Sequence, residues 1–331
     1  MRVIRIVAVL VLVALAAAGA VAWNWYRQPL PLPASPFAFE VRAGATLAGV
    51  ARQLQSAGAL PHAVALIALA RVEGVDRAIK AGSYEIDRGI TLPQLLAKLT
   101  QGDVTQSSLT IVEGATFAEL KRTLAGMRDL AHTVVDLPDA ELRAKLGIEQ
   151  PSAEGLFFPD TYFFATGSSD AALLKRAQRA LAERLSAGWE KRAPDLPFVA
   201  PYEALILASI VEKETGAPAD RPLIASVFVN RLKRGIRLQT DPTVIYGLGA
   251  KFDGNLRKRD LETDTPYNTY TRDGLPPTPI ALPSQASLDA VLNPPTTPYL
   301  YFVSRGDGSS EFSTNLADHN RAVSKYQKGG R

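Results

Sequence analysis

The chain begins with a long apolar run that differs from everything after it. Residues 6–23 form an uncharged stretch of 18 residues. A helix of that length rises about 27 Å, close to the ~30 Å hydrocarbon core of a bilayer. Two arginines precede the run, and an aromatic cluster follows it at Trp23, Trp25 and Tyr26. The positive-inside rule therefore predicts a membrane anchor over residues 1–27, with the N-terminus in the cytoplasm and the rest of the chain outside.

A cleaved signal peptide is the alternative for the same run. Residues 20–22 read Ala-Val-Ala, the small-x-small form that a signal peptidase accepts. Both alternatives send the folded part across the membrane. Closely spaced prolines then favour an extended stalk over residues 28–36, at Pro29, Pro31, Pro33 and Pro36.

After the stalk, an alternating apolar pattern followed by a glycine and a threonine occurs twice. Residues 39–47 resemble residues 109–117, an offset of 70 positions. Glycine tolerates the positive φ of a turn, and a threonine hydroxyl can accept a hydrogen bond from the first turn of a helix. Each copy therefore predicts a strand, a turn and a helix, with the helices over 47–57 and 117–124. Such turns also connect strands to helices in many unrelated folds.

Between the two copies, the periodicity predicts a helix, a strand and a second helix, over 63–72, 81–86 and 92–99. Small α+β modules of this kind resemble LysM-like glycan-binding units. We expect such a module over residues 37–105.

The remaining residues, 106–331, are expected to form a mixed α+β domain. Helical stripes and their caps predict three helices, over 170–192, 202–214 and 221–234. Many prolines then indicate a loop-rich stretch, which ends at a strand over 299–303. A turn at 306–308 leads back through Phe312, and a closing helix follows over 316–326. The fold class expected for the whole chain is α+β, with an N-terminal transmembrane helix.

The amino-acid composition excludes several classes of partner and of chemical site. The 331 residues are 47% hydrophobic, which is enough to bury real cores, and Lys plus Arg exceed Asp plus Glu by 37 to 33. That excess forms no basic stripe, so no nucleic-acid partner is expected. Absence of cysteine excludes disulfides and thiolate sites. The three histidines lie far apart, at His62, His132 and His319, and neither a metal nor a cofactor is expected.

The strongest chemical signal is an apolar helix that ends in two carboxylates, Glu212 and Glu214. At about 100° per residue, Glu214 falls between Leu207 and Ile210 on the most apolar side, whereas Glu212 projects on the less apolar side. Apolar surroundings raise the pKa of a carboxyl, as a general acid near neutral pH requires. Glu214 is therefore the better catalytic candidate. Alternatively, both glutamates solvate a fraying helix end and pair with Lys213 or Arg221.

At this point the sequence resembles the YceG-like (MltG) family of endolytic murein transglycosylases over nearly the whole chain past the stalk. Six segments carry the resemblance: EGLFFPDTY at 154–162, ASIVEKET at 208–215, RLQTDPTVIYG at 237–247, YNTY at 267–270 with GLPP at 274–277, YLYFV at 299–303, and Phe312 with Asn315, His319 and Asn320.

The resemblance implies a LysM-like module beside a catalytic domain whose acid lies at a helix end, similar to the Glu-Ser element of lysozyme-like transglycosylases. Glu214-Thr215 matches that element. The implied activity is cleavage of MurNAc-GlcNAc bonds to 1,6-anhydro-MurNAc ends, which would limit nascent glycan strands. One carboxylate suffices because the nucleophile is the substrate's own C6 hydroxyl. The implied partners are peptidoglycan glycan strands, the membrane and penicillin-binding synthases, and the implied location is the inner membrane with the catalytic domain in the periplasm.

Further polar residues in the matched segments are expected to line a sugar cleft: Gln239, Asp241, Tyr267, Asn268, Tyr270 and Asn315. Ordinary roles remain open for them: a turn at Asp241, a helix cap at Asn315 and core positions for the tyrosines. Glu154, Asp160 and Tyr162 are interpreted as mainly structural support between the domains. Two other classes stay open, a non-catalytic peptidoglycan-binding scaffold and a muramidase-type hydrolase.

Overall fold

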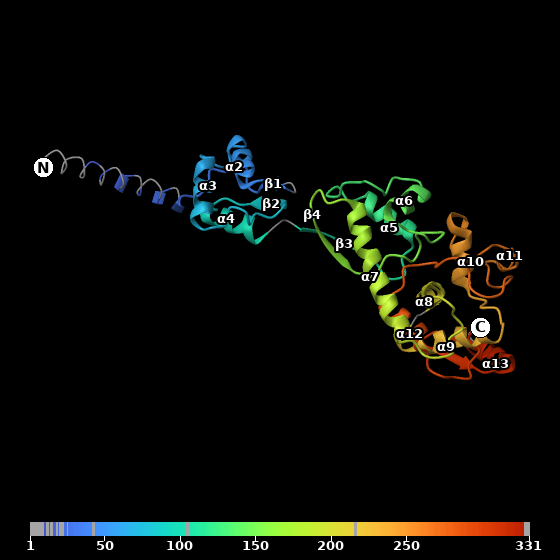
Figure 1. Ribbon diagram of the computed structural model, residues 1–331. Helices are drawn as coiled ribbons and strands as arrows, with labels where there is room; N and C mark the ends of the chain where they lie inside the picture. The colour runs from blue at the N-terminus through green and yellow to red at the C-terminus, as the bar shows by residue number, and fades with distance from the viewer. Residues whose placement is uncertain are drawn as a thin grey trace. The chain divides into compact units, whose positions relative to one another are not determined.

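The computed structural model describes residues 10, 13, 16–17, 19, 23–24, 26–41, 44–102, 106–214 and 217–327 (Figure 1). The chain divides into two compact units, residues 1–107 with 163–168, and residues 108–162 with 169–331. The described residues form three two-stranded sheets, β1–β2, β3–β4 and β5–β6, among many helices. The fold class is therefore α+β, as expected.

The expected anchor, residues 6–23, lies largely outside the described residues. Within the part of the chain that is described, no helix has both the length and the apolar character needed to cross a membrane.

The first unit is built on a short antiparallel pair, β1 (Phe37–Val41) and β2 (Gly82–Ile86), with Phe39 opposite Tyr84. Three helices pack with it: α2 (Leu47–Ser56), α3 (Ala63–Val72) and α4 (Leu92–Gln101). The Phe39 and Tyr84 rings stack with centroids 5.5 Å apart, and Tyr84 is fully buried. Leucines from all three helices fill the rest of this core.

Both glycine-threonine turns are confirmed. Gly44 and Gly114 have φ of 80° and 72°. Thr46 accepts a hydrogen bond from the Gly49 N–H at 3.2 Å, and Thr116 forms a reciprocal capping box with Glu119. The helices therefore begin where the sequence predicted, because the turn needs a left-handed residue and the first turn of the helix needs an acceptor.

The second unit is mostly helical, and α8 (Pro201–Glu214) runs through its centre (Figure 1). Residues 204–211 of α8 are all buried. It packs against α7 (Asp170–Glu190), α9 (Arg221–Lys233), α10 (Asp241–Leu248) and α12 (Gln285–Leu292). A helix buried on every side cannot show a one-sided apolar stripe, so neighbours on all sides are what its sequence requires.

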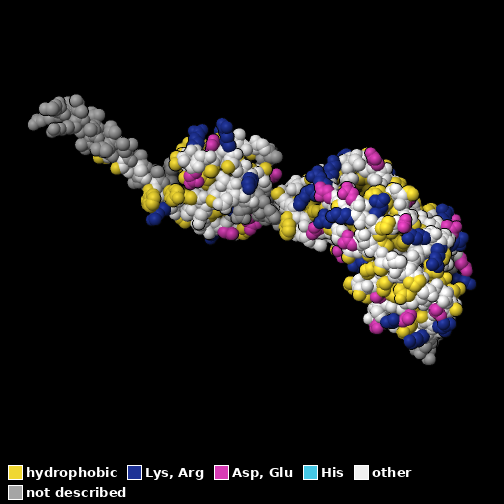
Figure 2. Space-filling model, turned by 60° about the horizontal axis from the view of Figure 1, so that its bottom comes forward, with side chains coloured by type: hydrophobic (Ala, Val, Ile, Leu, Met, Phe, Trp, Pro, Cys, Tyr) yellow, Lys and Arg dark blue, Asp and Glu magenta, His cyan; other side chains and the backbone are white. Residues whose placement is uncertain are grey.

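Smaller elements complete this unit. They are α5 (Phe117–Ala125), α6 (Asp139–Leu146), the 3-10 helices η1 (Pro218–Asp220) and η2 (Gly249–Lys251), α11 (Lys258–Glu262), β5 (Tyr301–Ser304), β6 (Ser310–Ser313) and α13 (Leu316–Tyr326). The division between the two units falls within the paired strands β3 (Gln106–Thr110) and β4 (Thr161–Ala165). The predicted hairpin is confirmed, since β5 and β6 are antiparallel with Phe302 opposite Phe312. On the face shown in Figure 2, basic and acidic side chains are interspersed.

The expected loop-rich stretch after Gly235 is confirmed for most of residues 235–299, but the expectation omitted the helices within it. Helices α10, α11 and α12 occupy parts of it. The prolines misled because Pro242 lies in the first turn of α10, where a missing N–H costs nothing and the fixed φ favours a helix. Asp241, for which a turn was the open alternative, is the first residue of that helix.

Candidate active site

Glu214 is the last described residue of α8, and Thr215, the second half of the predicted Glu-Thr element, lies outside the described residues. The Glu214 carboxyl lies at a pocket of about 620 Å³ within the second unit. The walls come from the end of α8, from α9, from the turn before α10, from the 270 loop, from the β5–β6 hairpin and from α13. The site is thus assembled from segments more than a hundred residues apart in sequence.

The surroundings of Glu214 favour its neutral form. Burial of the side chain raises the pKa of Glu214, and the nearby Asp241 carboxylate raises it further. Two contacts act in the opposite direction on that pKa: the hydroxyl of Thr240 donates a hydrogen bond to Oε1 of Glu214, and Arg231 contributes positive charge. Burial is the largest of these effects, so the carboxyl can hold a proton above the pH at which an exposed glutamate ionises.

Glu212 has different surroundings. Its side chain is only 7% exposed, and Oε2 accepts hydrogen bonds from the Ser284 N–H at 2.9 Å and from the Ser287 hydroxyl at 2.6 Å. Oε1 lies 3.8 Å from the guanidinium of Arg221. Because Ser284 is the N-cap of α12, Glu212 anchors the start of that helix. The pairing with Arg221 that the sequence left open is thus present for Glu212, which does not line the pocket.

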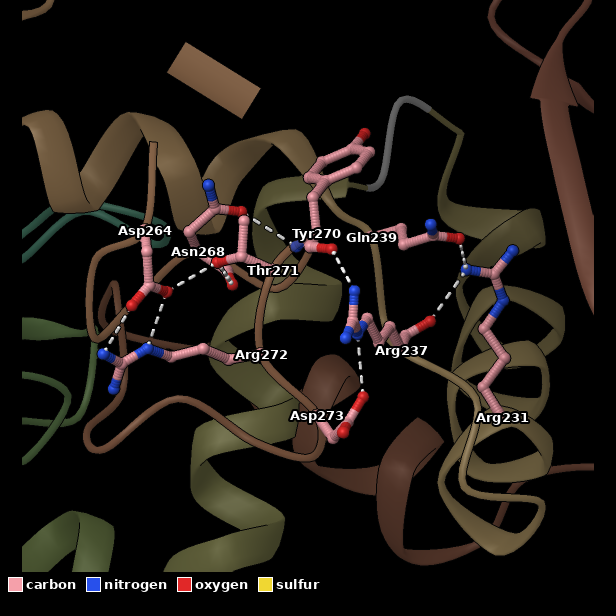
Figure 3. Close-up of polar contacts among 9 residues, drawn as sticks. All are labelled: Arg231, Arg237, Gln239, Asp264, Asn268, Tyr270, Thr271, Arg272 and Asp273. Carbon is pink, nitrogen blue, oxygen red and sulfur yellow. Dashed lines mark hydrogen bonds and ion pairs between the residues drawn. The ribbon is translucent and has the colours of Figure 1, made fainter. Parts of the chain in front are cut away.

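Three of the predicted cleft residues lie with Glu214 at the pocket: Gln239, Asp241 and Tyr270. The Tyr270 hydroxyl donates to Oδ1 of Asp241 at 2.6 Å. Gln239 points toward Arg231, as Figure 3 shows, with the Arg231 Nη1 3.5 Å from Oε1 of Gln239. The pocket therefore presents an amide, a carboxylate and a phenol beside the candidate acid.

The other three do not line this pocket. The Tyr267 hydroxyl shares a hydrogen bond with that of Thr278 at 2.8 Å. Asn268 is 0% exposed; its amide donates to the carbonyl oxygen of Thr263 at 2.7 Å, and its Oδ1 accepts from the Tyr270 N–H at 2.8 Å. Asn315 caps α13 by accepting from the Asp318 N–H at 2.9 Å. Their contacts shape the loops around the site, and contact with a sugar stays a prediction for them.

The sequence interpretation missed a cluster that lines the pocket, formed by Arg231, Tyr301 and His319. Arg231 is 8% exposed, and its guanidinium carbon lies 5.0 Å from the Tyr301 ring centroid. His319 stacks on the same ring with centroids 5.2 Å apart. Burial, together with the charge of Arg231, lowers the pKa of His319. The sequence contained one signal for Arg231. It lies on the same helix face as Ile224, Val227 and Phe228, at spacing i, i+3, i+4, i+7, and a charged side chain on an apolar face needs polar partners.

Glu154 is a second buried carboxyl, separate from the pocket. It is 3% exposed and accepts from the Phe117 N–H at 2.8 Å and from the Tyr246 hydroxyl at 3.1 Å. Burial raises the pKa of Glu154 to about 7. It links the first residue of α5 to α10, both in the second unit, so these contacts support that unit and not a junction between domains, as the sequence had suggested.

Comparison with known proteins places these features in one family. The model of the YceG-like family matches residues 39–325. An endolytic murein transglycosylase of Bacillus subtilis (strain 168) is 34% identical over 266 residues, covering 75% of this chain and 73% of that protein. One of Streptococcus pneumoniae (strain D39) is 28% identical over 320 residues, covering 86% of this chain and 57% of that longer protein.

A solved structure agrees. The crystal structure of a YceG-like protein from Listeria monocytogenes matches with a TM-score of 0.52 and 28% identity, over 86% of this chain and 98% of that one. The chain belongs to the YceG-like family.

Proposed function

We propose that this chain is an endolytic murein transglycosylase, a lyase that cuts the glycan strands of peptidoglycan with Glu214 as its acid and base. The observation that carries the proposal is the Glu214 carboxyl, with its raised pKa, at the wall of a pocket in a protein whose relatives are named endolytic murein transglycosylases. A buried carboxyl that stays protonated near neutral pH is the group that glycosidic bond cleavage requires first.

The reaction begins with transfer of the Glu214 proton to the oxygen that joins MurNAc to GlcNAc. As this bond breaks, the MurNAc ring develops oxocarbenium character, aided by its N-acetyl group. The Glu214 carboxylate then accepts the proton of the C6 hydroxyl, whose oxygen bonds to C1. The product carries a 1,6-anhydro-MurNAc end, no water is consumed, and Glu214 is again protonated.

The rest of the pocket suits a sugar. Gln239, Asp241 and Tyr270 offer hydrogen-bonding groups to hydroxyl and acetamido substituents. Tyr301 and His319, whose rings stack on each other, add aromatic surface to the pocket wall for the C–H groups of a pyranose ring. Tyr267, Asn268 and Asn315 contribute by shaping the loops and the helix start that surround these contacts.

The first unit is proposed to hold glycan as a LysM-like module. A pocket of about 450 Å³ beside the glycine-threonine turn supports this, because it combines a backbone turn with Ile67, Arg71 and Asp76. Residues 1–27 are proposed to anchor the protein in the inner membrane as a single span, with both units in the periplasm. We propose that the enzyme works at that face beside penicillin-binding synthases, where it limits the length of nascent strands.

Purified sacculi provide the test. The wild type should release muropeptides with anhydro ends, which mass spectrometry finds one water lighter than reducing ends. Glu214→Gln should abolish this release with a nearly unchanged melting temperature, because the amide keeps the shape but has no acidic proton. Glu183→Gln, on the exposed face of α7, is the matched control.

Each other outcome has a meaning. Reducing ends would identify a muramidase-type hydrolase. Glycan capture without any product would identify a binding scaffold. Normal turnover by Glu214→Gln would reject this residue as the acid.

A further inference from the structure

Thr240 makes the hydrogen bond that meets the Glu214 carboxyl. Its side chain is 2% exposed, and its hydroxyl donates to Oε1 of Glu214. A protonated carboxyl has one carbonyl oxygen and one hydroxyl oxygen, and only the oxygen without the proton accepts well from a neighbouring O–H. The contact therefore distinguishes the two oxygens of Glu214.

Two buried threonines hold Thr240 in place. The Thr240 N–H donates to the Thr269 hydroxyl at 3.1 Å, and the Thr243 hydroxyl donates to the Thr240 carbonyl at 2.8 Å. The Thr243 and Thr269 hydroxyls also share a hydrogen bond at 2.9 Å. With its N–H and carbonyl both engaged, the backbone of Thr240 is held in the position from which its hydroxyl reaches Glu214.

Arg231 holds the turn that leads into Thr240. Its Nη1 donates to the carbonyls of Arg237 at 3.1 Å and Leu238 at 2.8 Å, and it lies beside the Gln239 side chain (Figure 3). Gln239 has φ of 50°, a left-handed conformation that a non-glycine residue keeps only when its surroundings enforce it. The guanidinium thus stabilises a strained turn immediately before Thr240.

We propose that Thr240 is a positioning residue for the reaction: its hydroxyl occupies Oε1 of Glu214, so that Oε2 carries the proton given to the glycosidic oxygen. After that transfer, the same hydrogen bond stabilises the carboxylate until it takes the C6 hydroxyl proton. Arg231 supports this arrangement through the turn. The inference rests on the proposed function.

Charged and titratable groups from several elements face Glu214: Asp241 of α10, Arg231 of α9 and Tyr270 of the following loop. The Thr240 hydrogen bond is among the influences that lower the pKa of Glu214. Without the Thr240 hydroxyl, burial and Asp241 still raise the pKa of Glu214, and of these influences only Arg231 still lowers it. The alkaline limb of kcat/KM, which follows loss of the Glu214 proton, should therefore move to higher pH.

The experiment compares Thr240→Val, which keeps the shape, with Thr240→Ser, which keeps the donor. We expect Thr240→Val to lower kcat on the order of tenfold to hundredfold with little change in KM, because a misdirected proton slows only the chemical step. The alkaline limb should shift upward in that variant. Thr240→Ser should restore most of kcat and the original limb.

Thr297→Val is the control for loss of a threonine hydroxyl elsewhere, since Thr297 bonds to Ser226 at 2.8 Å. If Thr240→Val fails to fold, Thr240→Cys replaces it, and its weaker donor should give a smaller shift in the same direction. A Thr240 variant without the donor that keeps normal kcat and pH profile would overturn the inference, as would a loss that Ser does not restore. Normal turnover by Glu214→Gln would instead overturn the proposed function.

Discussion

Side chains two residues apart on an α-helix are rotated by about 200° around the helix axis. Glu212 and Glu214 therefore leave α8 on nearly opposite sides. Glu212 meets the serines at the start of α12 and the guanidinium of Arg221, and these contacts give it a structural role. Glu214 meets the pocket and one hydroxyl donor. At the residue scale, a glutamate therefore stabilises the fold at position 212, whereas at position 214 it lies at the pocket, where the proposed reaction needs a proton donor.

The first prediction concerns Glu212→Ala. The substitution leaves the Ser284 N–H and the Ser287 hydroxyl without their acceptor and Arg221 without its partner. We expect the free energy of unfolding to fall by about 2–4 kcal/mol. Urea denaturation followed by circular dichroism measures it, with the exposed Glu183→Ala as control. An unchanged midpoint would mean that Glu212 does not anchor α12.

The second prediction concerns Tyr270→Phe. It removes the hydroxyl that donates to Asp241 at 2.6 Å and leaves the ring in place. A hydrogen bond to a charged group contributes about 1.5–3 kcal/mol, so we expect kcat/KM to fall roughly tenfold or more. Turnover of purified glycan strands measures it. If Tyr270→Phe kept the kcat/KM of the wild type, the Tyr270 hydroxyl would have no role in the reaction.

At the element scale, buried carboxylates in the second unit connect the N-terminal ends of helices to neighbouring parts of the fold. Glu154 receives the N–H of the first residue of α5 and a hydroxyl of α10, while Glu212, on α8, holds the start of α12. Such contacts satisfy donors that a helix leaves unpaired at its N-terminus. Asp241, the first residue of α10, lines the pocket. The hydrogen bond from Tyr246 of α10 to Glu154 therefore helps to position this part of the pocket wall.

The third prediction follows from the burial of Glu154, which raises its pKa from 4.5 to about 7. Below pH 4.5 both the folded and the unfolded chain hold this proton. Between pH 4.5 and 7 the unfolded chain loses it while the folded chain keeps it, so stability falls as pH rises. We expect a loss of up to about 3 kcal/mol across this window, as an order of magnitude.

Glu154→Gln should remove that loss, because its carbonyl still accepts from the Phe117 N–H while the amide carries no charge. Urea midpoints of both proteins at pH 4.5 and pH 7.5 provide the measurement. Parallel pH dependence in the two proteins would show that Glu154 does not titrate between these values.

At the scale of the whole molecule, each pocket discussed above belongs to a single unit. The pocket beside the glycine-threonine turn is lined by residues of the first unit, and the Glu214 pocket by residues of the second. Glycan holding and bond cleavage are thus separable properties of the proposed enzyme, and the proposed membrane anchor over residues 1–27 is a third.

The fourth prediction concerns that segment. We expect the mature protein to keep residues 6–23, to require detergent for extraction from membranes, and to become extractable in buffer once residues 1–27 are deleted. Intact-mass measurement and fractionation test this. A mature chain that starts after Ala22 would establish the signal-peptide alternative.

Strongly periodic or capped elements could be predicted from local sequence. Helices α3 and α13 have the expected bounds, and both strand-turn-helix copies are present, because periodicity and capping act within a few residues. Helices α10 and α12 escaped prediction. Each is eight residues long, too short to show a clear period, and proline and polar residues at their starts resemble a loop until packing supports them.

The sequence alone identified the family, the α+β class and the two glutamates at the end of α8, since these depend on local pattern. Only the tertiary structure brought the serines of α12 to Glu212, and Thr240 and Arg231 to Glu214 from positions 26 and 17 residues away along the chain. The proton affinity of a carboxyl depends on what lies within a few ångströms of it, and those neighbours come from segments that folding alone brings together.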